Sequence, residues 1–269
     1  MPRIGPDRPT FPADIQLAGL GKSYGDGSDA VVAMAGVDLE IAAGEFIAVV
    51  GASGCGKSTL LRILAGFETA TAGTVTVAGE PVTGPSPERG VVFQDYGLFP
   101  WLTVAENIAF GPRQKRFPRE VVAERTEQFM ATVGLTRFAA SHPGQLSGGM
   151  QQRVAIARVL ANHPSVLLMD EPFGALDALT RSDMQRELAR IHAETGTTVL
   201  FVTHSIEEAV FLADRVVVMA GGASHGVPGH VREVVAIELD RERDPTSPEF
   251  NAHERHISGL VHAGLAPAA

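Results

Sequence analysis

Short runs of apolar residues alternate along the chain with longer segments in which apolar positions recur every three or four residues. The short runs are typical of buried β-strands, and the longer segments are typical of helices that bury one face. Strands are predicted at residues 15–20, 31–41, 46–50, 74–78, 91–93, 166–169, 198–202 and 215–219, with a weaker candidate at 231–239. Strands and helices that alternate in this way predict an α/β protein with a mostly parallel core sheet.

Turns and further helices fill the remaining segments. Residues 21–27 are rich in glycine and polar side chains and predict a turn between the first two strands, and residues 221–229 predict a loop. Ser205, with Glu208 three residues later, marks a helix start. Other helices are predicted at residues 60–64, 179–194 and 249–261.

The stretch between residues 103 and 160 contains no good strand. Thr103 and Glu106 have the spacing of a capping box, so a helix is expected from there, and residues 111–118 are expected to end it. A second helix is predicted over residues 119–133. This stretch therefore predicts a helical subdomain inserted into a body that contains the sheet.

These patterns suggest one large domain with attached segments. Its expected parts are a mobile N-terminal tail (1–13), the main domain (14–240) with the helical subdomain at about residues 100–160, and a C-terminal tail that is partly helical (241–269).

The glycine-rich stretch GASGCGKST, residues 51–59, follows a predicted strand and precedes a predicted helix. That context is the one in which the pattern G-x-x-x-x-G-K-[ST] forms a phosphate loop. Glycines let successive N–H groups point at an anion, Lys57 supplies a point charge, and the Ser58 hydroxyl can ligate Mg²⁺. We expect the loop to bind a nucleoside triphosphate. Cys55, the one cysteine in the chain, is expected to be a small filler residue.

Polar residues follow three of the predicted strands. Asp170 and Glu171 come after residues 166–169, His204 comes just after 198–202, and Gln94 follows 91–93. Ligands collect at the carboxyl ends of parallel strands, so Asp170 can hold Mg²⁺ and Glu171 can accept a proton from water. His204 can contact the γ-phosphate and hold the water and Glu171 in line. Gln94 can face Mg²⁺ or water, or bond its own loop. A lone histidine is more often structural, but three polar residues at one edge favour a site.

Two aromatic positions have a functional and a structural interpretation of equal weight. Tyr24 precedes the phosphate loop and can stack on a purine base or be a half-buried loop residue. Phe99 and Trp101 lie in a concentrated apolar segment that suits a protein docking groove or core packing.

The segment LSGGMQQRVAIARVL, residues 146–160, predicts a second helix N-terminus suited to an anion. Ser147 is a good N-cap, and Gly148 and Gly149 allow close backbone approach. Two such sites crowd one nucleotide within a monomer. If each caps the nucleotide of the other subunit, the protein is a nucleotide-clamped dimer.

Composition narrows the function classes. The 269 residues carry a net charge of −9, which argues against nucleic acid or anionic lipid as a partner. A single cysteine excludes an intrachain disulfide framework and fits a reducing compartment. No apolar run approaches the roughly 20 residues that span a bilayer, and the proline-rich N-terminus is not expected to be a signal peptide. Any role at a membrane is therefore expected to act through a partner.

With LSGGMQQR placed before VLLMDEP and after the phosphate loop, the chain resembles the ATP-binding subunit of an ABC transporter over about residues 15–219. The resemblance implies the P-loop NTPase ABC-ATPase fold, with a mostly parallel core sheet, an antiparallel β subdomain and an inserted helical subdomain. It also implies ATP and Mg²⁺ as cofactors and ATP hydrolysis coupled to transport.

The resemblance assigns binding roles residue by residue. Tyr24 matches the aromatic residue that stacks on adenine. The residues expected to bind the phosphates are Gly51, Ser53, Gly54, Cys55, Gly56, Lys57, Ser58 and Thr59, with Gln94 at the γ-phosphate. The expected Mg²⁺ ligands are Ser58, Gln94 and Asp170.

It assigns catalytic and dimer roles in the same way. Glu171 matches the general base and His204 the switch histidine, and Lys57 and Gln94 complete the expected catalytic set. The residues expected to contact the partner subunit's nucleotide are Ser147, Gly148 and Gly149, with Asp177 as a cross-subunit contact. The implied unit is an ATP-sandwich homodimer.

More narrowly, GPSPERGVVFQDYGLFPWLTVAENIAFG and DEPFGALDALTRSDMQREL resemble the importer branch for taurine, other aliphatic sulfonates and nitrate. That branch implies a permease, an extracytoplasmic solute-binding protein, and a peripheral position on the cytoplasmic face of the inner membrane. The resemblance weakens after residue 221. A soluble ABC ATPase, such as an iron–sulfur assembly ATPase, and an inactive nucleotide-binding subunit are the competing interpretations.

Overall fold

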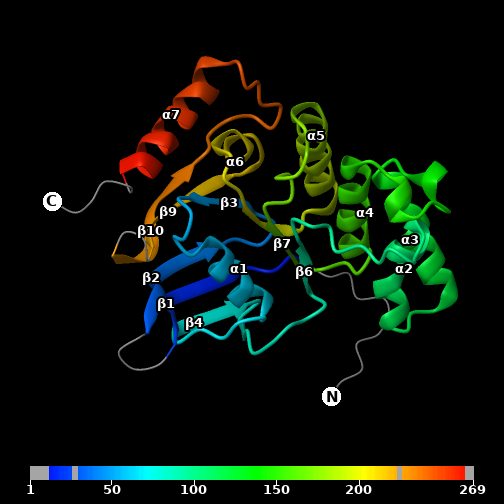
Figure 1. Cartoon of the computed structure of the whole chain (residues 1–269), viewed down its shortest axis with the longest axis horizontal. Helices are drawn as coiled ribbons and strands as arrows, with labels where there is room; N and C mark the ends of the chain where they lie inside the picture. The colour runs from blue at the N-terminus through cyan, green and yellow to red at the C-terminus, as the bar shows by residue number, and fades with distance from the viewer. Residues whose placement is uncertain (1–11, 26–29, 223–225, 264–269) are drawn as a thin grey trace.

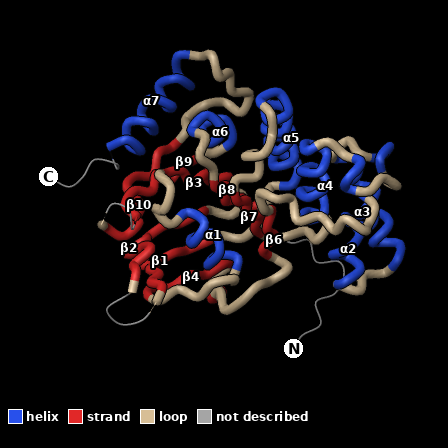
Figure 2. The backbone as a smooth tube through the Cα atoms, viewed as in Figure 1, coloured by secondary structure: helices blue, strands red, loops and turns tan. Residues whose placement is uncertain are grey.

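The computed structural model describes residues 12–25, 30–222 and 226–263. Within them, strands line up in the order β5-β4-β1-β2-β10-β9-β3-β8-β7-β6 (Figures 1 and 2). The strands are β1 (Ile15–Tyr24), β2 (Val31–Ile41), β3 (Phe46–Gly51), β4 (Ala72–Val77), β5 (Glu80–Pro81), β6 (Arg89–Val92), β7 (Val166–Asp170), β8 (Thr198–Val202), β9 (Arg215–Gly222) and β10 (Val227–Ala236). The helices are α1 (Lys57–Ala65), α2 (Val104–Gln114), α3 (Arg119–Thr132), α4 (Gly148–Leu160), α5 (Ala178–Thr195), α6 (Ile206–Leu212) and α7 (Pro248–Ala263), with short 3₁₀ helices η2 (Thr136–Phe138) and η3 (Pro143–Gln145).

The core of the sheet is parallel and is covered on both faces. β9, β3, β8, β7 and β6 pair in parallel. Along β3, Ile47 and Val49 join the cluster that contains α1, whereas Phe46, Ala48 and Val50 join the cluster that contains α4, α5 and α6. Successive side chains of a strand point to opposite faces, so an unbroken apolar strand needs a helical layer on each side.

The other end of the sheet is antiparallel. β4 pairs with β5 and β1, and β1 pairs with β2, all antiparallel. β10 runs antiparallel to β9 and touches β2 where Gly229 lies opposite Met34. The predicted fold class, a mostly parallel core with an antiparallel β portion and a helical insertion, is confirmed.

The helical insertion lies to one side of the sheet in Figure 1, with α2 and α3 farthest from it. The predicted capping box starts α2: Thr103 accepts a hydrogen bond from the Glu106 N–H, and Glu106 accepts one from the Thr103 N–H. α4 returns the chain to the sheet and buries Val154, Ile156 and Leu160. None of the helices in the described ranges is both long enough and apolar enough to cross a bilayer.

Two predicted boundaries in the sheet are wrong. The turn expected at residues 21–27 starts later, because β1 continues to Tyr24 through irregular pairing with β2. Residues 26–29 lie outside the described part. The loop expected at 221–229 is shorter, because Gly221 and Gly222 adopt φ of 82° and 117° and Gly222 pairs with Val227 across the hairpin.

Two other boundaries also differ. The helix expected to end before residue 111 continues to Gln114, with Pro112 inside it and buried. Residues 1–11 of the expected N-terminal tail lie outside the described part. Ala13 belongs to the body, because it is buried and its carbonyl accepts a hydrogen bond from Thr198 Oγ1 at 2.7 Å.

Candidate functional site

The phosphate loop curls around the amino group of Lys57. The loop joins β3 to α1, and Gly54 and Gly56 adopt φ of 81° and 100°. A Cβ on Gly51 would lie 2.3 Å from the carbonyl oxygen of Met219 on the neighbouring strand, so only glycine fits there. Lys57 is buried, and its Nζ donates to the Gly51 and Ala52 carbonyls at 2.7 and 3.0 Å. The loop thus holds a cation at a helix N-terminus, which favours an anion.

A cleft of about 190 Å³ opens above this loop. It is lined by Ala33, Ser53, Gly54, Gly56, Lys57, Ser58, Thr59, Glu171 and His204. Six predicted phosphate-binding residues therefore meet two predicted catalytic residues in one cavity. Cys55 does not line it: the side chain is fully buried, and burial raises the pKa of its thiol.

Glu171 and His204 meet at the edge of the cleft. They follow the adjacent parallel strands β7 and β8, and His204 Nε2 lies 2.5 Å from Glu171 Oε1. Glu171 has a φ of 47°, and its N–H donates to the carbonyl of Val202 at 2.9 Å. A non-glycine residue in this conformation is strained by about 1–3 kcal/mol and persists only where its surroundings hold it. A carboxylate paired with a histidine beside a phosphate loop has the geometry of a positioned base.

Asp170 and Ser58 bring two oxygen ligands together. The Ser58 hydroxyl, in the first turn of α1, donates to Asp170 Oδ1 at 3.3 Å. A hydroxyl and a carboxylate are oxygen ligands of the kind that Mg²⁺ prefers, and it binds with few protein ligands besides phosphate oxygens. The residues present therefore fit Mg²⁺.

Gln94 lies beside the loop that follows Glu171. Its amide is near Gly174, where an added Cβ would lie 3.2 Å from Gln94 Nε2. Gln94 is exposed and, like Asp170, does not line the cleft. Its expected place among the Mg²⁺ ligands stays a prediction.

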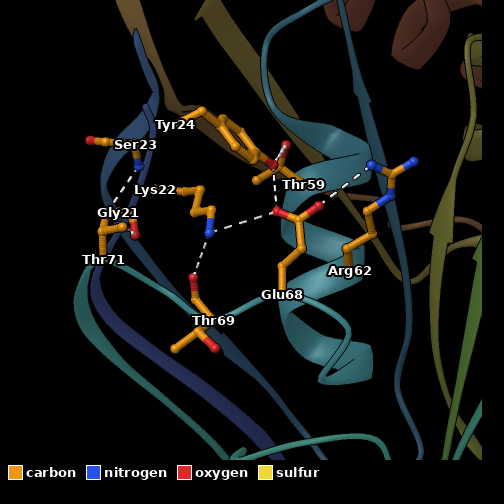
Figure 3. Close-up of polar contacts among 9 residues, drawn as sticks. All are labelled: Gly21, Lys22, Ser23, Tyr24, Thr59, Arg62, Glu68, Thr69 and Thr71. Atoms are coloured by element: carbon orange, nitrogen blue, oxygen red, sulfur yellow. Dashed lines mark hydrogen bonds and ion pairs between the residues drawn. The ribbon is translucent and has the colours of Figure 1, made fainter. Parts of the chain in front are cut away.

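Tyr24 lies at the end of β1 with its hydroxyl against α1 (Figure 3). The hydroxyl donates to Glu68 and lies 3.3 Å from the Thr59 hydroxyl, and Glu68 forms ion pairs with Lys22 at 3.9 Å and Arg62 at 3.4 Å. Burial, followed by the bond to Glu68, raises the pKa of Tyr24. The tyrosine remains 40% exposed. The cluster thus fixes a partly open ring next to a residue of the cleft.

The second helix N-terminus is formed as predicted but lies outside the cleft. The Ser147 hydroxyl accepts from the Met150 N–H at 3.4 Å at the start of α4. Asp177 caps α5 by accepting from the Thr180 N–H at 3.0 Å, and this bond lowers the pKa of Asp177. Ser147, Gly148 and Asp177 are exposed, and Gly149 is buried. None of the four lines the phosphate-loop cleft.

Sequence reasoning missed Glu68 and the contacts of the Glu208 carboxylate, two acidic groups near the site. Glu68 contacts Tyr24 from 44 positions away, and no local motif marks it. Glu208 was expected to complete a capping box with Ser205, but only half of the box forms: Ser205 Oγ accepts from the Glu208 N–H, whereas the Glu208 carboxylate accepts from Thr203 Oγ1. An acidic residue one helical turn after a histidine at a strand end is the signal that was available.

Known proteins share these features. The family model for the ABC transporter matches residues 34–174. An uncharacterised ABC transporter ATP-binding protein of Methanocaldococcus jannaschii is 47% identical, over 92% of this chain and 91% of its own length. The solved ATP-binding cassette MJ0796, a dimer in a post-hydrolysis state bound to ADP and Pi, is 33% identical over 84% of this chain and 100% of its own, with a TM-score of 0.71.

Relatives named for import or transport cover three small solutes. The nitrate import protein NrtD of Synechocystis sp. is 42% identical over 92% of this chain and 94% of its own length. The taurine import protein TauB of Roseobacter denitrificans is 43% identical over 87% of this chain and 88% of its own length. The bicarbonate transport protein CmpC of Synechococcus elongatus is 48% identical over 81% of this chain and 32% of its own length. The expected branch is therefore supported without one substrate being singled out. Because the family model spans more than half of the residues, the chain belongs to the ABC transporter family and is a transport ATPase of it.

Proposed function

We propose that the cleft above the phosphate loop binds the triphosphate of ATP and hydrolyses its terminal bond. Glu171 orients the attacking water and takes its proton, and His204 holds the Glu171 carboxylate in place. Lys57 and the N–H groups of the loop stabilise charge that develops on the phosphate oxygens. The contact of 2.5 Å between Glu171 and His204, in a cavity shared with Lys57, is the observation that carries this proposal.

Mg²⁺ fits beside Ser58 and Asp170, where it would neutralise charge on the phosphates. The pair offers a hydroxyl and a carboxylate oxygen 3.3 Å apart. Gln94, whose amide lies near Gly174, is a third candidate ligand. We therefore assign Ser58 and Asp170 as the resident ligands and Gln94 as a residue that arrives later or contacts water.

The active unit is proposed to be a homodimer. Ser147, Gly148 and Asp177 are exposed outside the cleft of their own chain, so they are available to a nucleotide held by a second copy, and Gly149 is the buried residue beside them. Leu179, beside Asp177, is an apolar side chain that is 74% exposed, as expected for a surface that a partner covers. MJ0796 forms a dimer.

A groove near Gln94 is proposed to dock a permease. It has a volume of about 620 Å³ and is lined by Phe93, Phe99 and Phe110 together with Lys115 and Arg158. Trp101 packs at a tilt against Phe99, with ring centroids 5.6 Å apart, and is 70% exposed. Aromatic walls with partly buried cations suit a partner helix that brings apolar side chains and an acceptor group.

With that partner, the subunit is proposed to sit at the cytoplasmic face of the cell membrane and to power import of a small anion. Nitrate, taurine and bicarbonate are named for its relatives. Within this class the branch resemblance favours taurine or another aliphatic sulfonate, delivered by an extracytoplasmic binding protein. Pull-down of the tagged chain from native membranes is expected to recover a multi-spanning permease. Recovery of soluble partners alone would contradict the importer role.

Glu171→Gln tests the catalytic assignment. The amide cannot accept the proton but keeps the size of the side chain, so kcat is expected to fall about 10²- to 10⁴-fold while ATP affinity is retained. Phosphate release and binding of a fluorescent ATP analogue measure the two quantities. Glu187→Gln is the matched control, because Glu187 pairs with Arg190 on α5 and does not line the cleft. Near-normal hydrolysis by Glu171→Gln would overturn the assignment.

A further inference from the structure

A buried carboxylate lies behind the proposed catalytic pair. Glu208, in α6, is 4% exposed, and burial raises the pKa of its carboxyl group. Its Oε2 accepts a hydrogen bond from Thr203 Oγ1 at 2.5 Å, and its Oε1 lies 3.6 Å from Arg181 Nε in α5. A buried carboxylate is costly unless it is paired and hydrogen-bonded, so these contacts account for its presence.

Glu208 holds both residues that flank His204. Thr203 donates to its carboxylate, and the Thr203 hydroxyl in turn accepts from the Ser205 N–H at 3.0 Å. The Ser205 hydroxyl accepts from the Glu208 N–H at 3.2 Å. The backbone on each side of His204 is therefore fixed to one residue in the following helix.

Arg181 holds the loop that begins at Glu171. Its guanidinium donates to the Leu176 carbonyl at 2.9 Å, at the end of a turn in which Gly174 N–H bonds to the Glu171 carbonyl at 3.1 Å. Glu171 needs such support, because its φ of 47° is strained. Arg181 thus constrains the far end of the turn that carries the proposed base.

The contacts close a ring. The turn that begins at Glu171 ends at Leu176, whose carbonyl accepts a hydrogen bond from Arg181. Arg181 pairs with Glu208, and Glu208 fixes Thr203, the residue before His204. His204 then contacts Glu171 at 2.5 Å. We propose that Arg181 and Glu208 form a clamp that positions Glu171 and His204 for hydrolysis. The clamp acts on the reaction only through these two residues, so it rests on the catalytic roles proposed above.

Two single variants and their double variant test the clamp in the full-length protein. Arg181→Met removes the tie to Leu176 and the ion pair, and Glu208→Gln removes the charge that faces Arg181. Each is expected to lower kcat about 10- to 100-fold at saturating ATP while the Kd of a fluorescent ATP analogue changes less than about threefold, because a lost positioning contact acts in the transition state. The double variant is expected to lose no more than the more damaged single variant.

Two further variants separate positioning from folding. Arg181→Met leaves Glu208 buried without its cation and is the variant most at risk of unfolding. Arg181→Lys keeps the positive charge but cannot reach Leu176 and Glu208 together, so we expect it to recover part of the kcat lost in Arg181→Met. Arg186→Met is the matched control, because Arg186 pairs with Asp183 on the exposed side of α5. Its kcat is expected to equal that of the wild type.

The outcomes separate the clamp from the proposed function. The clamp would be overturned if the kcat of Glu208→Gln and that of Arg181→Lys both stayed within about twofold of the wild type. It would also be overturned if the kcat losses of the single variants multiplied in the double variant. A fall in melting temperature together with a parallel loss of ATP affinity would also overturn it, since that indicates a structural role. An inactive wild type, or an active Glu171→Gln variant, would instead contradict the catalytic assignment on which the clamp rests.

Discussion

At the scale of single residues, the site depends on side chains held in unusual positions. Glu171 has a φ of 47°, and Lys57 is buried with its ammonium group on two loop carbonyls. Both arrangements are costly unless the surroundings supply partners. The carbonyls of Gly51 and Ala52 do so for Lys57, and His204 with the Val202 carbonyl does so for Glu171. These partners hold Lys57 and Glu171 in the positions that the proposed binding and catalysis require, and such fixed positions lower the cost of catalysis.

Tyr24 is predicted to set ATP affinity with little effect on turnover. Stacking of a base on an aromatic ring is worth about 1–3 kcal/mol, so Tyr24→Ala is expected to raise the Kd about 5- to 150-fold. Tyr24→Phe keeps the ring but loses the hydroxyl bonds to Glu68 and Thr59, and about a 2- to 10-fold rise is expected. Titration with a fluorescent ATP analogue measures both.

Phe138→Ala is the control for this prediction, because Phe138 and Tyr24 are each 40% exposed. Glu68→Gln is expected to resemble Tyr24→Phe, since the carboxylate anchors the hydroxyl. An unchanged Kd in Tyr24→Ala would exclude the stacking role.

Residues within continuous motifs were predictable, whereas their distant supports were not. The phosphate loop and the residues that end β7 and β8 are readable because each lies next to an apolar strand or a helix start. Whether Gln94 meets Ser58 and Asp170 depends on the path of its loop, which no spacing determines. The hydrogen bond from Tyr24 to Glu68 and the ion pair between Arg181 and Glu208 join segments that are far apart in the sequence. Only the fold brings these segments together.

At the scale of elements, segments with an uninterrupted apolar pattern were the most predictable and the glycine-containing boundaries the least. β8 matches its predicted bounds, because a short run of apolar and β-branched residues between polar residues predicts a buried strand. Gly111 and Pro112 suggested the end of a helix, yet α2 passes through both. A Cβ on Gly111 would lie 2.2 Å from the side chain of Asn162, so this glycine serves close packing rather than a turn.

A comparison of two helical glycines tests this explanation. Gly259, in α7, has nothing within 4 Å of an added Cβ. Alanine is favoured over glycine in a helix by about 1 kcal/mol, so Gly259→Ala is expected to raise the free energy of unfolding by about 0.5–1 kcal/mol. Gly111→Ala is expected to lower it by about 1–3 kcal/mol, because Asn162 must move and lose its bond to the Arg158 carbonyl. Urea denaturation measures both values, and shifts of the same sign would refute the packing explanation.

At the scale of the whole molecule, the two helix N-termini that we propose to bind anions favour a dimer. α1 and its phosphate loop line the cleft with Glu171, whereas Ser147 at the start of α4 is exposed outside it. If a second copy places Ser147 against the γ-phosphate, dimerisation requires ATP and hydrolysis dissolves it. A variant that binds ATP without hydrolysing it should then accumulate as the dimer.

Light scattering after size exclusion tests this directly. Glu171→Gln is expected to elute at about 28.4 kDa without nucleotide and at about twice that mass with Mg²⁺ and ATP. Adding Ser147→Glu places a carboxylate where the triphosphate is expected, and repulsion between the two anions should keep the protein monomeric while each chain still binds ATP. Thr136→Glu adds the same charge to an exposed position of the helical insertion and should leave the dimer intact. A dimer that forms equally well with Ser147→Glu would mean that α4 does not contact the partner's nucleotide, and the second anion site would need another ligand.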